Sequence, residues 1–421
     1  MKFVFVSNYL NHHQIPFCRA MYERTGGSFV FLQTEPMEEE RVRMGWNSRV
    51  EEPYLRLSYE APQESLKLIR EADVVLFGGT DDESYAKERL STGKPLFRYS
   101  ERIYKTGQWK AVSPRGLRKK YEDHGKWKKA PVYLLCSGAY VASDFHLIGA
   151  YPGKKYCWGY FPETREEDVD KLLQEKGYVT PEGKKVPYLL WSGRMIDWKH
   201  PELVVETAQY LRDRGREFYL EMIGGGAMEE QIREMIRTRQ LEKYVSLPGF
   251  LKPEEVRDRM ERADVYLITS DRQEGWGAVA NEAMNSGCVV VADHMIGAAP
   301  YLIRHGENGM LFRDGDAAML FTAVDALLED PKRREALGRK AFETIWKTWN
   351  AENAAARLCG LVEELTGIAV DEGEKRDQRM AAERAGKDAK AGPWNLAPCD
   401  PAPLLREFGS YGVLTGKRNG S

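Results

Sequence analysis

The stretch Asp271–Asp293, which reads DRQEGWGAVANEAMNSGCVVVAD, decides the fold expected for this chain. An apolar run over 264–270 precedes it, and Gly287 separates a helix-forming segment from the apolar run Cys288–Ala292. This order favours a strand, a glycine turn, a helix that stops at a glycine, and a buried parallel strand. In an open α/β sheet, ligands bind where the carboxyl ends of strands meet the amino ends of helices. The stretch therefore predicts a parallel sheet with a ligand site at its edge.

Two glutamates carry the chemistry predicted for this stretch. Glu274 lies on the loop before the helix, and Glu282 lies eight residues later, about two helical turns on. Between them, Gly275, Trp276 and Gly277 form a tight turn whose backbone N–H groups can approach a phosphate. A nucleotide-sugar has a hexose on one side of its diphosphate and a ribose on the other, and both carry pairs of hydroxyls. Two carboxylates that flank a phosphate-binding turn could each bind one of these pairs. A solvated Glu274 and a helix-capping Glu282 are the alternative.

Length and composition set the class of protein. A chain of 421 residues predicts two or more domains. With 42% hydrophobic residues, 30% charged residues and a net charge of −2, the composition is that of a soluble globular protein and gives no argument for nucleic acid. We find neither an apolar run of about 18 residues nor a signal-peptide pattern. Six scattered cysteines without a CxxC pair are typical of a reducing compartment, so we expect a cytoplasmic protein without disulfides or zinc.

Apolar runs alternate with helix-length stretches, which predicts doubly wound parallel sheets. In the first half the expected strands are Phe3–Val6, Phe29–Leu32, Val74–Phe77, Leu96–Tyr99 and Val132–Cys136, with helices at Ile15–Arg24 and Gln63–Ala72 among others. In the second half the expected strands are Tyr188–Ser192, Tyr219–Ile223, Val245–Leu247, Val265–Thr269, Val289–Ala292 and Met310–Phe312, with helices at Glu202–Arg212 and Glu229–Thr238 among others. The segment 151–186 is expected to be the hinge, and a helix is expected over Trp346–Leu365.

Two segments of the first half are candidate surfaces. The loop after the first strand contains Asn11, His12 and His13, which would contact an acceptor hydroxyl or a phosphate; a polar turn with a helix cap is the alternative, and no metal-ligand spacing completes the histidines. The segment 102–129 has ten Lys or Arg residues against two acids, with aromatic residues between them. Such a segment suits an anionic headgroup surface, and RNA or a solvated basic helix are the alternatives.

Cationic residues follow a strand of the second half. Gly193, Arg194 and Lys199 lie on the loop beyond Ser192, where positive charge would neutralise a diphosphate leaving group; surface salt bridges are the alternative. The triplet Gly224–Gly226 fails the dinucleotide pattern, because Glu229 stands where the third glycine of GxGxxG belongs.

Together these motifs resemble those of the family 4 retaining glycosyltransferases of GT-B fold. The resemblance covers about residues 185–345 and rests on Gly193, Arg194 and Lys199, Gly224–Gly226, Pro248–Phe250, Glu274 with Glu282, Ala283–Gly287 and Gly306–Phe312, in that order.

The resemblance implies a division of labour between two Rossmann-like domains that face each other across a cleft. Arg194 and Lys199 would clamp the diphosphate, Glu274 would bind the donor hexose, and Glu282 would bind the ribose. The residues implied in catalysis are Glu274, Arg194 and Lys199, and those implied in donor binding are Gly193, Phe250, Glu274, Gly275, Trp276, Gly277, Ala278 and Glu282. Such enzymes generally need no metal and no other cofactor, and they retain the anomeric configuration by front-face attack, in which the leaving phosphate takes the acceptor proton.

The chain departs from the family pattern mainly on the acceptor side. Asn11–Gln14 stands where Gly-Gly is common, and Gly297–Tyr301 lacks a glycine and an acid of the usual pattern. The family's N-terminal histidine near the hexose has no clear counterpart, and Glu101 is the candidate for its place. The acceptor-side candidates are therefore Asn11, His12, His13 and Glu101.

The prediction for the whole chain is a hexosyltransferase of cell-surface polysaccharide or glycoconjugate synthesis, with a nucleotide-sugar donor and a glycan or lipid-linked acceptor. A silent sugar-nucleotide-binding partner of another transferase and a GT-B nucleotide-sugar epimerase are the alternatives. We expect an acceptor domain over 1–165, a donor domain over 166–345, a helix over 346–370 that crosses back to the first domain, and a charged tail over 371–421. Membrane contact through 102–129, at the inner face of the membrane, is a hypothesis.

Overall fold

The computed structural model describes residues 1–38, 51–108, 111 and 113–369. The predicted charged tail over 371–421 lies outside the described residues. The chain divides into two compact units. Among the described residues, the first contains Met1–Glu163 and 348–369, and the second contains Thr164–Lys347. The expected domain boundaries at 165/166 and 345/346 lie two residues from these divisions.

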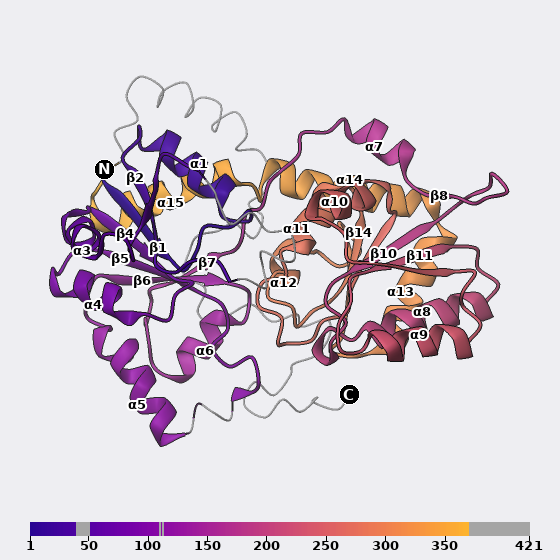
Figure 1. Ribbon diagram of the computed structural model, residues 1–421, viewed down its shortest axis with the longest axis horizontal. Helices are drawn as coiled ribbons and strands as arrows, with labels where there is room; N and C mark the ends of the chain where they lie inside the picture. The colour runs from indigo at the N-terminus through magenta and orange to yellow at the C-terminus, as the bar shows by residue number, and fades with distance from the viewer. Residues whose placement is uncertain (39–50, 109–110, 112, 370–421) are drawn as a thin grey trace. The chain divides into compact units, whose positions relative to one another are not determined.

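The first unit is built on one parallel sheet of seven strands in the order β3-β2-β1-β4-β5-β6-β7. The strands are β1 (Phe3–Ser7), β2 (Phe29–Gln33), β3 (Leu55–Leu57), β4 (Val74–Phe77), β5 (Leu96–Ser100), β6 (Val132–Ser137) and β7 (Lys155–Trp158). The helices are α1 (Ile15–Arg24), α3 (Pro62–Glu71), α4 (Glu83–Ser91), α5 (Pro114–Asp123), the 3-10 turn η2 (Gly125–Trp127), α6 (Val141–Leu147) and α15 (Ala351–Thr366). In Figure 1, α1 and α15 lie on one face of the sheet, and α4 and α6 lie on the other.

The five strands predicted for this half are confirmed, because their apolar residues are buried on both faces of the sheet. The prediction of a hinge over 151–186 is wrong in its first part. There Cys157 of β7 lies in register with Cys136 of β6, so the segment extends the sheet.

The second unit holds a parallel sheet of six strands in the order β12-β11-β10-β13-β14-β15 and a two-stranded hairpin, β8 with β9. The strands are β8 (Tyr178–Val179), β9 (Lys185–Val186), β10 (Tyr188–Ser192), β11 (Tyr219–Ile223), β12 (Val245–Gly249), β13 (Val265–Ile268), β14 (Val289–Asp293) and β15 (Met310–Phe312). The helices are α7 (Val169–Glu175), η3 (Asp197–Lys199), α8 (Pro201–Asp213), α9 (Glu229–Thr238), α10 (Pro253–Arg262), α11 (Val279–Asn285), α12 (Ala299–Leu302), α13 (Ala317–Glu329) and α14 (Pro331–Lys347). Figure 1 shows α10, α11 and α14 on one face of the sheet and α8, α9 and α13 on the other.

The rest of the expected hinge belongs to the second unit. The hairpin packs on the main sheet, where the ring of Tyr178 stacks on that of Tyr219 with centroids 3.8 Å apart. The strands predicted for this half are confirmed within two residues, since each is an apolar run enclosed by helices.

The helix predicted over Trp346–Leu365 is wrong at its start. The helix α14 ends at Lys347, and α15 begins at Ala351 after a break. The side chain of Asn350 caps α15 by accepting a hydrogen bond from the backbone N–H of Asn353 (2.9 Å), which fixes a helix start at this point. The helix α15 packs against the first unit, where the hydroxyl of Tyr133 donates to the carbonyl of Leu365 (3.4 Å).

Within the part of the chain that the structure describes, no helix combines the length and the apolar character that a bilayer-spanning segment needs.

Candidate functional site

The candidate site of the second unit lies at the point where the strand order reverses. The first strand of this sheet, β10, has β11 on one side and β13 on the other, so the loops after β10 and β13 leave the sheet side by side at its carboxyl edge. In doubly wound sheets this switch point is the usual ligand crevice. The loop after β10 carries Gly193, Arg194 and Lys199, and the loop after β13 carries Glu274.

An ion pair joins the two loops. The Nζ atom of Lys199 bonds to a carboxylate oxygen of Glu274, and the two side chains are only 16% and 15% exposed. Both cations of the first loop also lie near the indole of Trp198, with Nζ of Lys199 5.0 Å and Cζ of Arg194 5.9 Å from the ring centroid. Arg194 itself is exposed, so its guanidinium is open to solvent at this edge. The structure thus brings together the three residues predicted to act in catalysis.

Hydrogen bonds beneath the ion pair hold the two loops together. Thr269 accepts a bond from the indole N–H of Trp191 (3.1 Å) and donates from its hydroxyl to the carbonyl of Lys199 (2.7 Å). The backbone N–H of Asp271 donates to the carbonyl of Trp198 (2.9 Å). These bonds restrict the separation of Lys199 and Glu274, because each lies within a few residues of a bonded position.

His200 is a site residue that the sequence did not single out. Its backbone is left-handed (φ 48°, ψ 52°), and its imidazole lies between two carboxylates. Its Nδ1 atom is 2.8 Å from Glu202, and its Nε2 atom is 3.8 Å from Asp271 of the other loop. The carboxylates of Asp271 and Glu202 raise the pKa of His200 to about 10, so the imidazole is charged at neutral pH. A lone histidine in a loop gives no signal of this role, because Asp271 approaches it only in the fold.

The glycine turn of the second loop is rigid. Gly277 has φ +84°, and a Cβ atom there would lie 2.9 Å from Cγ2 of Ile296, so the position requires glycine. The predicted donor contact at Trp276 is through its backbone N–H. Its side chain is 1% exposed and donates from Nε1 to Oδ1 of Asn281 (2.8 Å), which makes it part of the core. Gly275 lies beside it, and the N–H of Ala278 is at the entry to α11.

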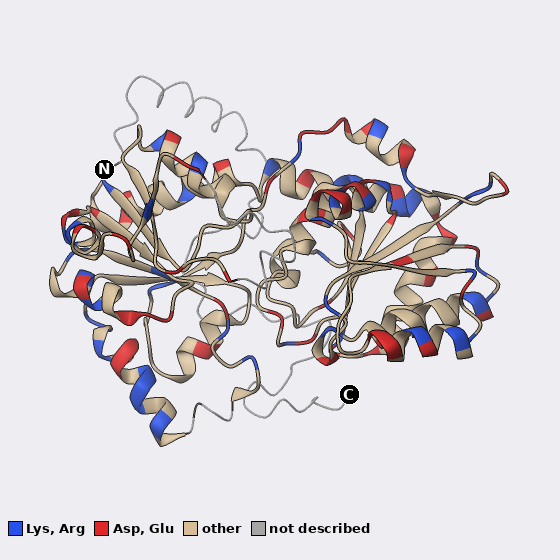
Figure 2. Cartoon of the chain, viewed as in Figure 1, with Lys and Arg blue, Asp and Glu red and all other residues tan. Residues whose placement is uncertain are grey.

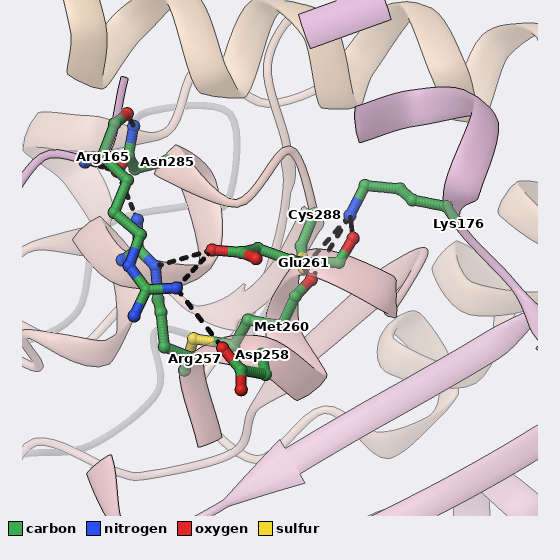
Figure 3. Close-up of polar contacts among 8 residues, drawn as sticks. All are labelled: Arg165, Lys176, Arg257, Asp258, Met260, Glu261, Asn285 and Cys288. Carbon is green, nitrogen blue, oxygen red and sulfur yellow. Dashed lines mark hydrogen bonds and ion pairs between the residues drawn. The ribbon is translucent and has the colours of Figure 1, made fainter. Parts of the chain in front are cut away.

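Glu282 lies in the first turn of α11, close to a buried arginine of the neighbouring helix. Burial lowers the pKa of the Arg257 guanidinium, and the nearby Glu282 carboxylate opposes that shift. The amide oxygen of Asn285 accepts bonds from Arg257 and from the backbone N–H of Arg165 (2.8 Å for the latter). Figure 3 shows this cluster, in which Arg165 also pairs with Glu261 (2.6 Å). The cluster ties α10 to α11 and thereby sets the position of Glu282.

Phe250 lies at the β12 side of the same edge. Its side chain is 65% exposed, although it is a large apolar group. The loop after β11 is bonded to both neighbours, since the N–H of Gly224 donates to Gly249 (2.8 Å) and that of Gly193 donates to Ile223 (3.0 Å). Phe250 therefore belongs to the same connected set of loops as Gly193.

The acceptor-side candidates lie at the carboxyl edge of the first sheet. Nδ2 of Asn11 donates a hydrogen bond to Oε1 of Gln14 (3.0 Å). The ring centroids of His12 and His13 are 3.8 Å apart. Glu101 accepts a bond from the hydroxyl of Tyr160 (2.8 Å) and pairs with Lys105 (2.6 Å).

A small cavity of about 30 Å³ lies beside these candidates, and His13 is the one that lines it. Its lining is largely aromatic and includes Phe17, Tyr99 and Trp158 together with His13 and Tyr160. His13 and Tyr160, the hydrogen-bond partner of Glu101, thus line one cavity, although they follow strands β1 and β7, which are not neighbours in the sheet.

Comparison with known proteins supports the assignment of the second unit. Residues 175–344 match the family described as glycosyl transferases group 1. This stretch forms a group 1 glycosyl transferase domain. Curated relatives include alpha-D-kanosaminyltransferase of Streptomyces kanamyceticus, 27% identical over 179 residues, which are 42% of this chain and 46% of that protein. D-inositol 3-phosphate glycosyltransferase of Corynebacterium diphtheriae is 32% identical over 177 residues, which are 40% of each chain. The matched stretch spans less than half the length of these relatives.

Solved structures extend the likeness beyond the group 1 domain. HepE of Anabaena in complex with UDP superposes with a TM-score of 0.64 at 16% identity, over 86% of this chain and all of that one. Sucrose-phosphate synthase of Thermosynechococcus elongatus gives a TM-score of 0.58 at 16% identity, over 87% of this chain and 99% of that one. These likenesses show the fold, which is α/β of the GT-B type, and the predicted fold class is confirmed.

Proposed function

We propose that this protein is a retaining hexosyltransferase that moves a hexose from a nucleotide-diphosphate sugar to a glycan or lipid-linked acceptor in cell-surface polysaccharide or glycoconjugate synthesis. The observation that carries the proposal is the Lys199–Glu274 ion pair beside Arg194 at the switch point of the second sheet. A group 1 glycosyl transferase domain around this pair supports it, as does the likeness to a structure that binds UDP.

The two charges of the ion pair suit the two ends of a sugar diphosphate. The sugar hydroxyls of an entering donor can donate hydrogen bonds to the Glu274 carboxylate. Its phosphate oxygens can accept hydrogen bonds from Lys199 and Arg194. In the reaction, the acceptor oxygen bonds to the anomeric carbon, the bond from that carbon to the diphosphate breaks, and the acceptor proton passes to the released phosphate. Fixed cations stabilise the charge that develops on the leaving group. We propose that these side chains perform this task without a metal ion, so that chelator leaves the rate unchanged.

The donor site can be tested with nucleotides alone. We expect UDP, GDP or ADP, or one of their sugars, to raise the melting temperature of the full chain. A ligand at a hundredfold excess over its dissociation constant adds about 2.7 kcal/mol to the free energy of unfolding. The variants Glu274→Ala and Arg194→Ala should lose the gain, and Arg237→Ala, an exposed residue of α9, should keep it. A chain that no nucleotide stabilises would contradict the proposal.

The acceptor side includes a proposed contact with an anionic membrane surface. In the part of 102–129 that the structure describes, Lys and Arg gather along α5 (Figure 2). Leu117 and Tyr121 of the same helix are 39% and 59% exposed, one helical turn apart, and lie beside the exposed Arg118. Basic and apolar residues that share an exposed face suit a headgroup layer, where each cation contributes about 1 kcal/mol.

This contact predicts binding to lipid vesicles. The protein should sediment with vesicles that contain phosphatidylglycerol at low salt, and it should remain in solution with phosphatidylcholine alone. The double variant Arg118→Glu with Lys119→Glu should lose sedimentation without losing its nucleotide-induced thermal shift. Equal binding of the wild type to both vesicle types would show that α5 makes no specific contact with an anionic membrane. Equal binding of the wild type and the double variant to the phosphatidylglycerol vesicles would show the same.

A further inference from the structure

A cavity of about 440 Å³ lies at the edge of the second sheet opposite to the candidate site. Its lining includes Pro187, Asp264 and Gly287, which come shortly before β10, β13 and β14. These strands are parallel neighbours, so their amino ends share one edge, and the loops with Lys199 and Glu274 leave from the other. The five residues of β10 separate the two edges by about 16 Å. A ligand in this cavity would therefore not occupy the candidate site.

Three cationic side chains from three segments line the cavity. Lys176 comes from the segment after α7, Lys185 from β9, and Arg334 from the first turn of α14. The acids of the lining are Asp264, which is buried, and Glu335, which is exposed. Three cations against two acids leave an excess of positive charge around the cavity, which favours an anionic ligand.

Most polar atoms at the inner end of the cavity are already hydrogen-bonded. Nζ of Lys176 donates to three carbonyls at the end of α10, beside Asp264. One oxygen of Asp264 accepts from the N–H of Tyr188 (2.9 Å), and the other accepts from Nε of Arg334 (3.1 Å). Arg334 also donates from Nη1 to the carbonyl of Leu327 (2.7 Å). Among the residues that the structure describes, no acceptor bonds Nη2 of Arg334, so this nitrogen can donate to a ligand.

Lys185 supplies a second donor, and a glycine leaves room for its stem. Gly177 has φ +112°, and a Cβ atom there would lie 2.7 Å from Cε of Lys185. Nζ of Lys185 donates to the carbonyl of Gln174 (2.8 Å), so two of its three N–H groups remain for a ligand. Because Gly177 follows Lys176 in the chain, the two ammonium groups belong to one wall of the cavity.

We propose that this cavity binds a small phosphate ester, with the phosphate at Arg334 and Lys185. The inference does not rest on the proposed function. Since Nε and Nη1 of Arg334 are occupied, the guanidinium lacks the free pair of donors that matches a carboxylate. A phosphate has oxygens that point in several directions, so it can accept from single donors on separate side chains. The cavity has about fifteen times the volume of one liquid water molecule, which leaves room for a short polyol beside the phosphate.

Calorimetric titration of the full chain with inorganic phosphate and glycerol 3-phosphate, at low salt, tests the proposal. Glycerol and glycerate are the comparison ligands, because glycerol has no charge and glycerate has a carboxylate in place of the phosphate. We expect both phosphates to bind, and glycerol and glycerate to bind at least about tenfold more weakly than glycerol 3-phosphate, the usual effect of a lost charge-assisted hydrogen bond.

Variants of exposed residues locate the binding. Lys185→Met should weaken glycerol 3-phosphate at least about tenfold. Its control is Lys184→Met, which removes the neighbouring ammonium, paired with Glu217 outside the lining, and should leave the affinity unchanged. Glu335→Gln removes a repelling carboxylate and should raise the affinity about threefold, a gain that misfolding cannot produce. Arg194→Ala, at the opposite edge, should leave the affinity unchanged.

Failure of both phosphates to bind, equal losses in Lys185→Met and Lys184→Met, or the absence of a gain in Glu335→Gln would overturn the proposal. Equal or tighter binding of glycerate would overturn the choice of a phosphate. Loss of binding in Arg194→Ala would also overturn it, because that result would place the phosphate at the candidate donor site. The proposed function is tested separately, by the thermal shift with nucleotides.

Discussion

His200 shows how one residue can hold a site together without facing the ligand. It bridges Glu202 at the start of α8 and Asp271 on the loop that carries Glu274, while the preceding residue, Lys199, makes the ion pair. Burial alone would raise the pKa of Asp271, but the interaction with His200 and the N–H of Gln273 lowers it. The pair therefore favours a charged imidazole and an ionised carboxylate in the folded state.

This arrangement predicts a pH-dependent contribution to stability. The pKa of His200 is raised in the folded chain, so its contribution is complete below pH 6.5 and is lost as the pH rises toward 10. His200→Asn keeps a residue that tolerates the left-handed backbone and removes the charge. The melting temperature of the variant should be lower than that of the wild type at pH 6, and the difference should shrink steadily toward pH 10. A constant difference across this range would show that the imidazolium has no role.

Two variants of Lys199 separate the effect of its charge on nucleoside diphosphate binding from the effect of its side-chain shape. Lys199→Met removes the ammonium and should weaken nucleoside diphosphate binding by about 1.5–3 kcal/mol, the usual worth of a hydrogen bond to a charged group. Lys199→Arg retains the charge and should lose less. Titration of UDP and GDP against both variants measures the difference. Equal losses in both would mean that the clamp depends on the shape of the lysine side chain.

At the scale of elements, the carboxyl end of α10 depends on a lysine from the segment before β8. Lys176 is 6% exposed, and its Nζ donates to the carbonyls of Met260 (3.3 Å), Glu261 (3.2 Å) and Ala263 (2.6 Å), as Figure 3 shows in part. Burial lowers the pKa of Lys176. Its nitrogen donates to three carbonyls at the helix end, of which those of Met260 (2.9 Å) and Ala263 (3.3 Å) also accept from the thiol of Cys288.

Removing this cap should destabilise the second unit. Lys176→Met keeps the apolar stem and removes three hydrogen bonds from a charged donor to helix-end carbonyls, at a cost of about 1–3 kcal/mol. Urea unfolding should show a lower midpoint with an unchanged slope. Lys171→Met, on an exposed face of α7, is the control and should shift stability by no more than about 0.5 kcal/mol. If the two variants unfold at the same midpoint, the three carbonyls find other partners.

At the scale of the whole molecule, each unit has its own hydrophobic core. Among the residues that the structure describes, the core of the second unit runs from Leu189 to Leu337 and lies within Thr164–Lys347. Arg194 and Lys199 of the proposed clamp, and Glu274, lie inside the same limits. We therefore expect the fragment 164–347 to fold and to show a thermal shift with the nucleotide that stabilises the full chain. The same fragment with Arg194→Ala should melt at a similar temperature without that shift. A fragment that folds and binds no nucleotide would assign part of the donor site to the first unit.

Local sequence patterns were sufficient to predict most strands and the loops that carry the candidate residues. Strands such as β10 and β4 were predicted to the residue, because a central strand of a parallel sheet is apolar on both faces and leaves an apolar run. Short edge strands such as β3, and the break at Asn350, were missed, because three residues of mixed character or one capping side chain give little periodic signal. The motifs of the second half, by their order along the chain, also indicated the family.

The contacts between these residues could not be predicted from the sequence, because they depend on the order of the strands in the sheet. Lys199 and Glu274 are 75 positions apart, and they pair because β10 and β13 are neighbours in the sheet. The same adjacency places Asp271 near His200. The side chain of Trp276 is buried in the core, so only its backbone can contact a ligand. Local propensity and motif spacing act over a few residues, whereas these pairings follow from strand order, and strand order is set by the packing of the whole unit.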